Sequence, residues 1–171
     1  KVAEIAHEPR MAAIMKRWRD VTSLRKPDRA PVWWRPMDCW KEILPESSMT
    51  CRDPWLRGLE YGFRQILFKR DVDDDTPVEP LFEVPAQFDV DPPNCWGVDI
   101  AHHESAADGG AWGFDPPLKT EADFGRLRLP TFRYNAAKTE AALARARDLL
   151  GDILPVKRVC HAPLALGQLG F

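Results

Sequence analysis

Residues 30–34 of the chain read Ala-Pro-Val-Trp-Trp, an apolar run of strand length that is closed by Arg35 and Pro36. A short apolar run bounded by proline and charge predicts a buried strand. Patterns typical of helices lie on both sides of it in the sequence, beginning near residue 8 and at residue 53. A strand enclosed by two helices is the start of the alternation that α/β proteins show.

The segment in front of this strand predicts an amphipathic helix over residues 8–27. Ile14, Trp18 and Val21 recur at i, i+4 and i+7, so they form one apolar stripe. Lysines and arginines occupy the other faces and the C-terminal end, where positive charge is favourable to the helix dipole. Pro27 ends the helix, because proline cannot continue it.

The stretch behind the strand begins a second helix and then becomes irregular. Asp53 followed by Pro54 is an N-cap with proline in the first helical position. Residues 78–85 form an extended apolar run that predicts the next strand. Residues 86–117 contain two Pro-Pro pairs and one Gly-Gly pair, so we expect a long irregular excursion with short strands.

The last third of the chain is more regular. Thr120 and Asp123 resemble a capping box at the start of a short helix. Asn135 caps a longer helix that Gly151 ends, and residues 153–160 predict a buried strand. The resulting rhythm of strands and helices predicts an α/β fold with parallel strands.

Composition places the chain among ordinary globular proteins. It has 171 residues, 44% of them hydrophobic and 29% charged, and a net charge of −2. The small net charge argues against a nucleic-acid partner, and no apolar run reaches the roughly 18 residues that would indicate a membrane span. The four cysteines are widely spaced, so we expect free thiols and a cytoplasmic location.

Charge is unevenly distributed along the sequence. Residues 1–35 carry nine Lys or Arg and four Asp or Glu, a balance of +5, whereas residues 71–123 carry fourteen acids and Lys119, a balance of −13. Such an acidic stretch repels itself unless it is solvated or faces cations. We interpret most of these carboxylates as a solvated rim.

Three stretches, in this order, resemble the uroporphyrinogen decarboxylase superfamily, which includes corrinoid-dependent methyltransferases. The first, Lys16-Arg17-Trp18 through Lys26-Pro27-Asp28-Arg29-Ala30-Pro31-Val32-Trp33, resembles the family's opening helix and its Asp-Arg-x-Pro-Val entry into the first barrel strand. The second, residues 116–124 followed by Leu127 and Pro130, is similar to the family's Pro-Pro-Ile-Lys-Thr-Pro-Glu-Asp-Leu helix opening. The third, residues 154–156 through 162–166, resembles a strand that leads into Gly-Pro-Phe-Thr-Leu.

The resemblance implies the N-terminal half of a (β/α)₈ TIM-type barrel with a preceding N-terminal helix. Residues 1–171 would then be the N-terminal portion of one barrel domain, with 8–27 as the leading helix and 86–117 as the excursion. Such barrels typically need about 250 residues. The sequence also stops within a predicted helix at residues 164–171, so we expect the chain to be part of a larger fold.

The resemblance also implies an activity, methyl transfer between a small substrate and a corrinoid (cobalamin) that a partner protein carries. Zinc, where the family uses it, would be bound by residues outside this chain. Uroporphyrinogen decarboxylases carry Arg-Gln-Ala-Gly-Arg-Tyr after the first strand, whereas residues 35–40 here read Arg-Pro-Met-Asp-Cys-Trp. Only one arginine remains to hold substrate carboxylates, which favours the methyltransferase branch. Decarboxylation of a carboxylated pyrrole and small-molecule binding without turnover are the alternatives.

Trp33, Trp34 and Arg35 are the candidate substrate-binding residues. In a parallel barrel, side chains at the C-terminal end of a strand face the active-site mouth. A guanidinium beside two indoles can hold an anionic or aromatic substrate by pairing and stacking. The alternative is that the tryptophans belong to the core and that Arg35 makes a structural ion pair.

Glu79, Glu83 and His161 are the candidate catalytic residues. The two glutamates are four residues apart, so we expect them on one face of a strand, where one can act as acid, base or cation ligand. Glu79 is the first choice and should lie beside Arg35 on the neighbouring strand. His161, at the end of the third strand, suits a proton shuttle. Structural ion pairs and a structural histidine are the alternatives.

His102, His103 and Glu104 are residue types found in metal sites. Neighbours on a strand point to opposite faces, so such a run does not converge on one ion. We therefore interpret residues 102–104 as a polar loop and assign no metal ligand to this chain.

Overall fold

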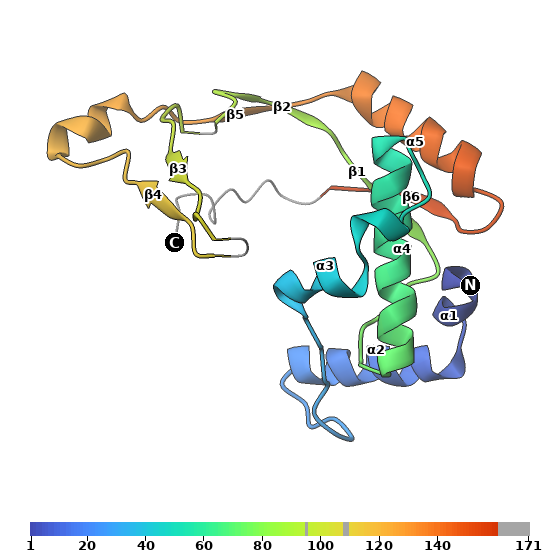
Figure 1. Ribbon diagram of the computed structural model, residues 1–171. Helices are drawn as coiled ribbons and strands as arrows, with labels where there is room; N and C mark the ends of the chain where they lie inside the picture. The colour runs from blue at the N-terminus through green and yellow to red at the C-terminus, as the bar shows by residue number, and fades with distance from the viewer. Residues whose placement is uncertain (95, 108–109, 161–171) are drawn as a thin grey trace. The chain divides into compact units, whose positions relative to one another are not determined.

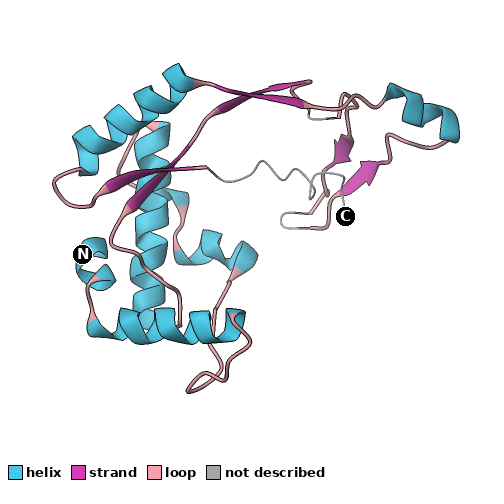
Figure 2. Cartoon of the chain, turned by 180° about the vertical axis from the view of Figure 1, so that it is seen from behind, coloured by secondary structure: helices cyan, strands magenta, loops and turns pink. Residues whose placement is uncertain are grey.

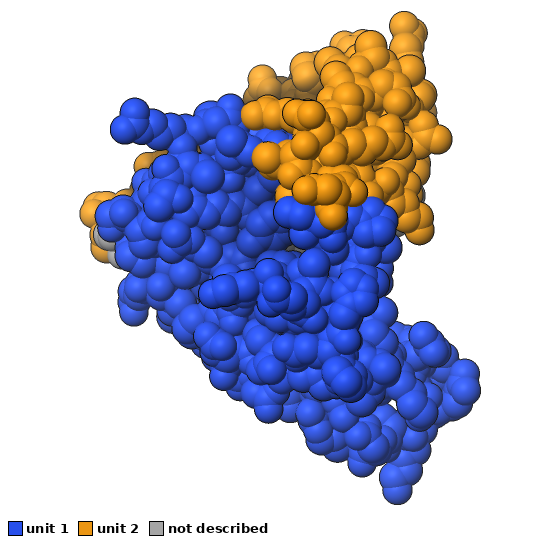
Figure 3. All heavy atoms as spheres, turned by 90° about the vertical axis from the view of Figure 1, so that its right-hand side faces the viewer, with its two compact units in different colours: residues 1–82, 153–155 blue, residues 83–152, 156–171 orange. Residues whose placement is uncertain are grey.

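The computed structural model describes residues 1–94, 96–107 and 110–160. The chain divides into two compact units, drawn in different colours in Figure 3. Unit 1 consists of residues 1–82 and 153–155, and unit 2 begins at residue 83 and contains 83–152 together with the chain from residue 156. Each unit is described by itself below.

Unit 1 is helical. Its α-helices are α1 (Val2–Ala6), α2 (Pro9–Thr22), α3 (Trp40–Ile43) and α4 (Pro54–Val72), with short 3₁₀ turns at Met37–Cys39 and Glu46–Ser48. In Figures 1 and 2, α1 and α2 lie against the C-terminal half of α4. The buried core there consists of Ile5, Ala6, Met11, Ile14 and Val78, with Ile66 and Leu67 of α4 packed against it.

The start of α4 was predicted correctly. The Asp53 carboxylate accepts a hydrogen bond from the Leu56 N–H at 3.0 Å, and Pro54 occupies the first helical position. The leading helix is shorter than the predicted span of 8–27. It ends at Thr22, and Leu24 has a left-handed φ of 55°, which a helix does not continue.

The predicted strand at residues 30–34 is wrong, because residues 31–36 belong to no helix or strand. Pro31 has no N–H to offer a neighbouring strand. The Val32 N–H donates to the Asp75 carboxylate at 2.8 Å, and the Trp34 N–H donates to the Asp74 carboxylate at 3.1 Å. One backbone bond, from the Asp75 N–H to Val32 O, completes the attachment. The backbone N–H groups of Val32 and Trp34 therefore donate to side-chain carboxylates, whereas in a sheet they would donate to a neighbouring strand.

A parallel pair of strands, β1 (Phe82–Pro85) and β6 (Val156–Val159), forms one small sheet. The Phe82 N–H donates to Pro155 O, and the Ala86 N–H donates to Val159 O, each at 2.8 Å. Both strands advance by four residues between these bonds, which is the order of a parallel pair. The strand that was predicted at 78–85 therefore begins only at Phe82.

The helix α5 (Ala136–Leu150) precedes β6 and packs against it. Asn135 caps it as predicted, since its side chain accepts from the Lys138 N–H at 2.9 Å. The buried face consists of Thr139, Leu143, Ala146 and Leu150. The fully buried Thr139 hydroxyl donates to Asn135 O and accepts from the Gln87 N–H, so its burial leaves no unpaired hydroxyl.

The segment 86–117 is irregular with short strands, as predicted. It contains β2 (Phe88–Asp91), β3 (Ala101–His103) and β4 (Gly113–Asp115). β3 pairs with β4, and β2 pairs with β5 (Thr131–Tyr134), which the sequence pattern did not reveal. Both pairs are antiparallel, so the expected parallel arrangement holds for β1 and β6 but not for these two pairs. Between β4 and β5 in the sequence, Thr120 and Asp123 form the predicted capping box, but the helix that follows, Glu121–Arg126, is a 3₁₀ helix.

The chain therefore mixes helices with small sheets of two strands each. Within the described ranges, no helix is both long and apolar enough to cross a membrane. Cys39, Cys51 and Cys160 are free thiols.

Candidate functional site

A buried carboxylate, Asp75, organises the residues around the candidate substrate-binding segment. Its side chain is 2% exposed and accepts hydrogen bonds from Arg17 at 2.6 Å, from Arg29 at 2.5 and 2.8 Å, and from the Val32 N–H at 2.8 Å. Its backbone oxygen accepts from the Trp18 indole at 2.7 Å. Four residues that lie more than 40 positions before Asp75 in the sequence thus meet at one aspartate.

The charge on Asp75 is stabilised by these partners. Burial by itself raises the pKa of a carboxyl group, but the hydrogen bonds from Arg29 and Val32 and the positive charges of Arg17 and Arg29 outweigh it. The pKa of Asp75 is accordingly lowered. Because the group stays ionised, it holds both arginines and the backbone at Val32 in place.

Arg17 binds both Asp75 and Asp28, which lies shortly before the candidate substrate-binding residues 33–35 in the sequence. Its side chain is 8% exposed, and it donates twice to Asp28, from Nε at 2.9 Å and from Nη2 at 2.7 Å. These bonds lower the pKa of Asp28 to about 2 and raise that of Arg17. Bidentate pairs of this kind fix geometry as well as charge. The turn between α2 and Val32 is thereby tied to the helix.

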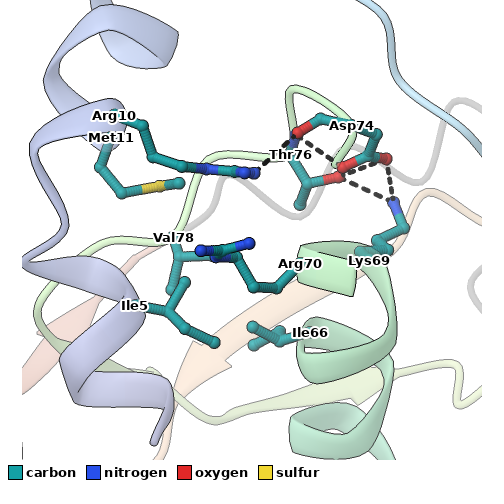
Figure 4. A pocket seen from close by; sticks show the side chains of 9 residues that line it. All are labelled: Ile5, Arg10, Met11, Ile66, Lys69, Arg70, Asp74, Thr76 and Val78. Atoms are coloured by element: carbon teal, nitrogen blue, oxygen red, sulfur yellow. Dashed lines mark hydrogen bonds and ion pairs between the residues drawn. The ribbon is translucent and has the colours of Figure 1, made fainter. Parts of the chain in front are cut away.

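Asp74, the residue before Asp75, binds the other end of the candidate segment, at Trp34. Its carboxylate accepts from the Trp34 N–H, from the Thr76 N–H and from the Thr76 hydroxyl, and it lies 3.6 Å from Lys69 Nζ. Figure 4 shows Asp74 between Lys69, Thr76 and Arg10, whose guanidinium donates to the Asp74 backbone oxygen. Asp74 and Asp75 together hold both ends of the Val32–Trp34 segment.

Most of the acids that the structure describes between residues 71 and 123 are exposed, as we expected, but two in the acidic tract of residues 71–75 are not. Asp71 and Asp73 are exposed, but Asp74 and Asp75 are buried at 5% and 2% exposure. The reason is the excess positive charge of residues 1–35, which supplies Arg10, Arg17 and Arg29. The opposite charge balances of the two segments were the signal that could have revealed this pairing.

The side chains of Trp33 and Arg35 are exposed at the surface, next to Val32 and Trp34, whose backbone the two aspartates hold. The Trp33 side chain is 52% exposed, and the Arg35 guanidinium carbon lies 4.8 Å from its ring centroid. Lys69 Nζ lies 5.3 Å from the same ring. Two cations within about 6 Å of an indole are in range for cation–π attraction. We call Trp33, Arg35 and Lys69 the indole–cation surface.

Trp34 lies apart from this surface. Its ring is half-buried and packs against Trp40 and Phe68, with centroid distances of 6.1 and 5.6 Å. Aromatic pairs at such distances contribute packing energy. Of the two tryptophans, Trp34 therefore fits the alternative that we stated from the sequence, in which the ring packs in the core and does not bind substrate. Lys69 belongs to the surface in its place, and sequence reasoning had not singled it out.

The two candidate glutamates do not share a strand. Glu79 is exposed and precedes β1, whereas Glu83 lies within it, also exposed. The prediction that both occupy one face of a strand is therefore wrong. In the described part of the chain, Arg35 and Glu79 lie outside every strand and have no hydrogen bond or ion pair with each other. His161 lies outside the described residues.

The interpretation of residues 102–104 as a loop is corrected for its two histidines, which lie on β3. His103 Nε2 lies 3.0 Å from Asp115 on β4 and lowers the pKa of that carboxyl, while His102 contacts Trp112. Among the residues that the structure describes, no group of three or more His, Cys, Asp or Glu side chains is placed to hold a metal ion.

Comparison of the chain with models of known protein families, with curated proteins and with solved structures found no significant match. The resemblance to the uroporphyrinogen decarboxylase superfamily therefore stays a prediction from the three stretches of sequence. The contacts of Arg17, Asp28, Arg29 and Val32 described above concern the first of these stretches.

Proposed function

We propose that this chain is the N-terminal portion of a uroporphyrinogen decarboxylase-like (β/α)₈ barrel, and that the protein transfers a methyl group between a small substrate and a corrinoid carried by a partner protein. The observation that carries this proposal is the convergence on Asp75. Arg17, Arg29 and Val32, all from the first resembling stretch, bond directly to that carboxylate, and Asp28 bonds to Arg17. Because these residues of the first resembling stretch are joined through one carboxylate, they support the interpretation of that stretch as one structural unit.

The arrangement of β1, α5 and β6 supports the barrel. Parallel strands require a crossover connection, and a helix that leads into the second strand is the usual one. α5 occupies that position and buries one face against β6. Parallel sheets are normally covered on both faces, which a closed barrel with outer helices provides.

The indole–cation surface supports the choice of substrate. An exposed indole offers a flat apolar face, and Arg35 offers a planar fork of donors to an oxygen anion. A substrate with a single anionic or oxygen-bearing group suits one arginine better than a porphyrinogen with many carboxylates does. Glu79 and Glu83 stay predictions as proton-transfer groups, and both are accessible to solvent.

The test uses the natural polypeptide that contains residues 1–171, with free cob(I)alamin in place of the carrier protein. Methanol, methylamine, dimethyl sulfide and 3-methoxybenzoate are offered separately as methyl donors, and loss of cob(I)alamin is followed by absorbance. We expect protein-dependent loss with at least one donor. Release of carbon dioxide from a pyrrole carboxylate without any methyl transfer would favour the decarboxylase alternative, and saturable donor binding without turnover would favour the non-catalytic one. Either result contradicts the proposal.

A further inference from the structure

Unit 2 contains a pocket that has no part in the function proposed above. Its volume is about 200 Å³, and Trp96, Phe114, Pro116 and Leu127 are among the residues that line it. Apart from the indole of Trp96, Asn94 is the only polar side chain in the described lining, and none of the described lining residues is charged. The pocket is therefore an apolar, partly aromatic site.

The Trp96 wall is fixed by backbone bonds. The Trp96 N–H donates to Asn94 O at 2.8 Å, and Trp96 O accepts from the Arg128 N–H at 3.0 Å. The Asn94 side chain accepts from the Gly97 N–H at 2.8 Å and closes the turn. Gly97 has a φ of +77°, a conformation that favours glycine. The turn holds Trp96 beside Leu127, which is the neighbour of Arg128.

The opposite wall is equally constrained. Phe114 lies on β4, which pairs with β3 (Figure 1), and Pro116 and Pro117 follow directly. Proline fixes φ, and Arg126 donates a hydrogen bond to Pro117 O. A pocket whose backbone is fixed before binding loses little conformational entropy when a ligand enters.

One polar group in this lining has no partner among the residues that the structure describes. Trp96 Nε1 is buried and donates to none of their acceptors. Asn94 cannot serve, because its amide nitrogen donates to Asp99 at 2.8 Å and its oxygen accepts from Gly97. A buried donor without an acceptor costs free energy, and native structures contain few of them. An acceptor supplied by a ligand would remove that cost.

We propose that this pocket binds a neutral, single-ring molecule that carries one hydrogen-bond acceptor. An apolar cavity of about 150 Å³ is enough for benzene, so about 200 Å³ admits a ring with a small substituent. The absence of charged groups among the described lining residues disfavours a charged ligand, because its desolvation would be uncompensated. Because Nε1 is inaccessible to solvent in the unliganded chain, we infer that binding includes a small rotation of the indole that brings its N–H to the acceptor.

Two ligands of nearly equal shape test the proposal. Acetophenone has a carbonyl oxygen where α-methylstyrene has a methylene group, so only acetophenone can accept from Trp96. Each is titrated into the ¹⁵N-labelled natural polypeptide that contains residues 1–171 while its indole N–H signals are recorded, among them those of the seven tryptophans of this chain. The Trp96 signal is identified as the one that is lost in Trp96→Phe. We expect saturable binding of both ligands, about three- to tenfold tighter for acetophenone, and a large shift of the Trp96 signal with acetophenone alone.

Two variants complete the experiment. Trp96→Phe keeps an aromatic wall but removes the donor, so acetophenone should lose its advantage while both ligands still bind. Trp55→Phe, in α4 of unit 1, should change neither affinity. Equal affinities for the two ligands in the unaltered protein would overturn the proposal even if Trp96→Phe failed to fold. The absence of a saturable shift of the Trp96 signal, assigned with a folded Trp96→Phe variant, would overturn it as well.

Discussion

Arg17 and Asp75 lie 58 residues apart in the sequence and form an ion pair of 2.6 Å from which the solvent is almost wholly excluded. The same guanidinium binds Asp28, and the same carboxylate binds Arg29 and the Val32 N–H. Through these bonds, one buried pair fixes the path of the chain from α2 to the indole–cation surface. The predictions below test that dependence and its consequences.

Asp75→Asn should strongly destabilise the chain. The substitution removes the buried one of the two carboxylates that bind Arg17 and leaves only Asp28, and breaking a buried ion pair typically costs about 3–5 kcal/mol. Urea unfolding of the chain measures the change. Asp71→Asn, in the same acidic tract but exposed, is the matched control and should change the free energy of unfolding by about 0.5 kcal/mol or less. Equal effects of the two substitutions would show that Asp75 does not organise the unit.

Glu60 should contribute to stability in a pH-dependent way. The N–H groups of Cys51 and Thr50 donate to its carboxylate and lower its pKa from an ordinary 4.5 to about 2. Between these values the unfolded chain binds more protons than the folded chain, so this stability is fully present above about pH 5 and is lost as the pH falls towards 2.

Melting temperatures between pH 7 and pH 2 measure this contribution. Glu60→Gln should lower the melting temperature at pH 7 and reduce the further loss on acidification, because the glutamine does not titrate. Glu121→Gln, an exposed acid at the start of the 3₁₀ helix, is the control. An unchanged acid profile in Glu60→Gln would contradict the assignment.

The cap of α4 should be measurable by itself. Asp53→Ala removes the acceptor of the Leu56 N–H and should cost about 0.5–2 kcal/mol, whereas Asp53→Ser keeps an oxygen in that position and should cost less. Both are measured by urea unfolding. If alanine and serine gave the same stability, the capping bond would have no energetic role.

Local signals predicted the starts of helices well. Asp53 and Asn135 each accept the N–H of a residue three positions later, so the information lies within one turn. The capping box of Thr120 and Asp123 was visible for the same reason. The pattern could not show that this helix is 3₁₀.

The wrong prediction of a strand at residues 30–34, and the failure to predict Lys69, come from contacts between residues that are far apart in the sequence. Residues 30–34 have the composition of a strand, but the N–H groups of Trp34 and Val32 donate to Asp74 and Asp75, which lie 40 and 43 positions later in the sequence. β5 reads Thr-Phe-Arg-Tyr, an alternation of polar and aromatic residues over only four positions, and it is exposed along its length; this short signal was not recognised as a strand. Of the candidate site, Trp33 and Arg35 come together because they are near neighbours, whereas Lys69 joins them only through the fold.

The central claim is that Arg35 holds the substrate of a methyltransferase beside Trp33. The most direct measurement is KM and kcat for methyl transfer to cob(I)alamin, in the natural polypeptide that contains residues 1–171, for Arg35→Lys and for the control Arg25→Lys, with the melting temperature of each variant. Arg35 is exposed and stacks over Trp33, and lysine replaces its planar fork with a point charge. We predict a rise in KM of about tenfold, or about 1.4 kcal/mol, with an unchanged melting temperature, and no effect of Arg25→Lys. Unchanged KM and kcat in a folded Arg35→Lys variant would contradict the claim.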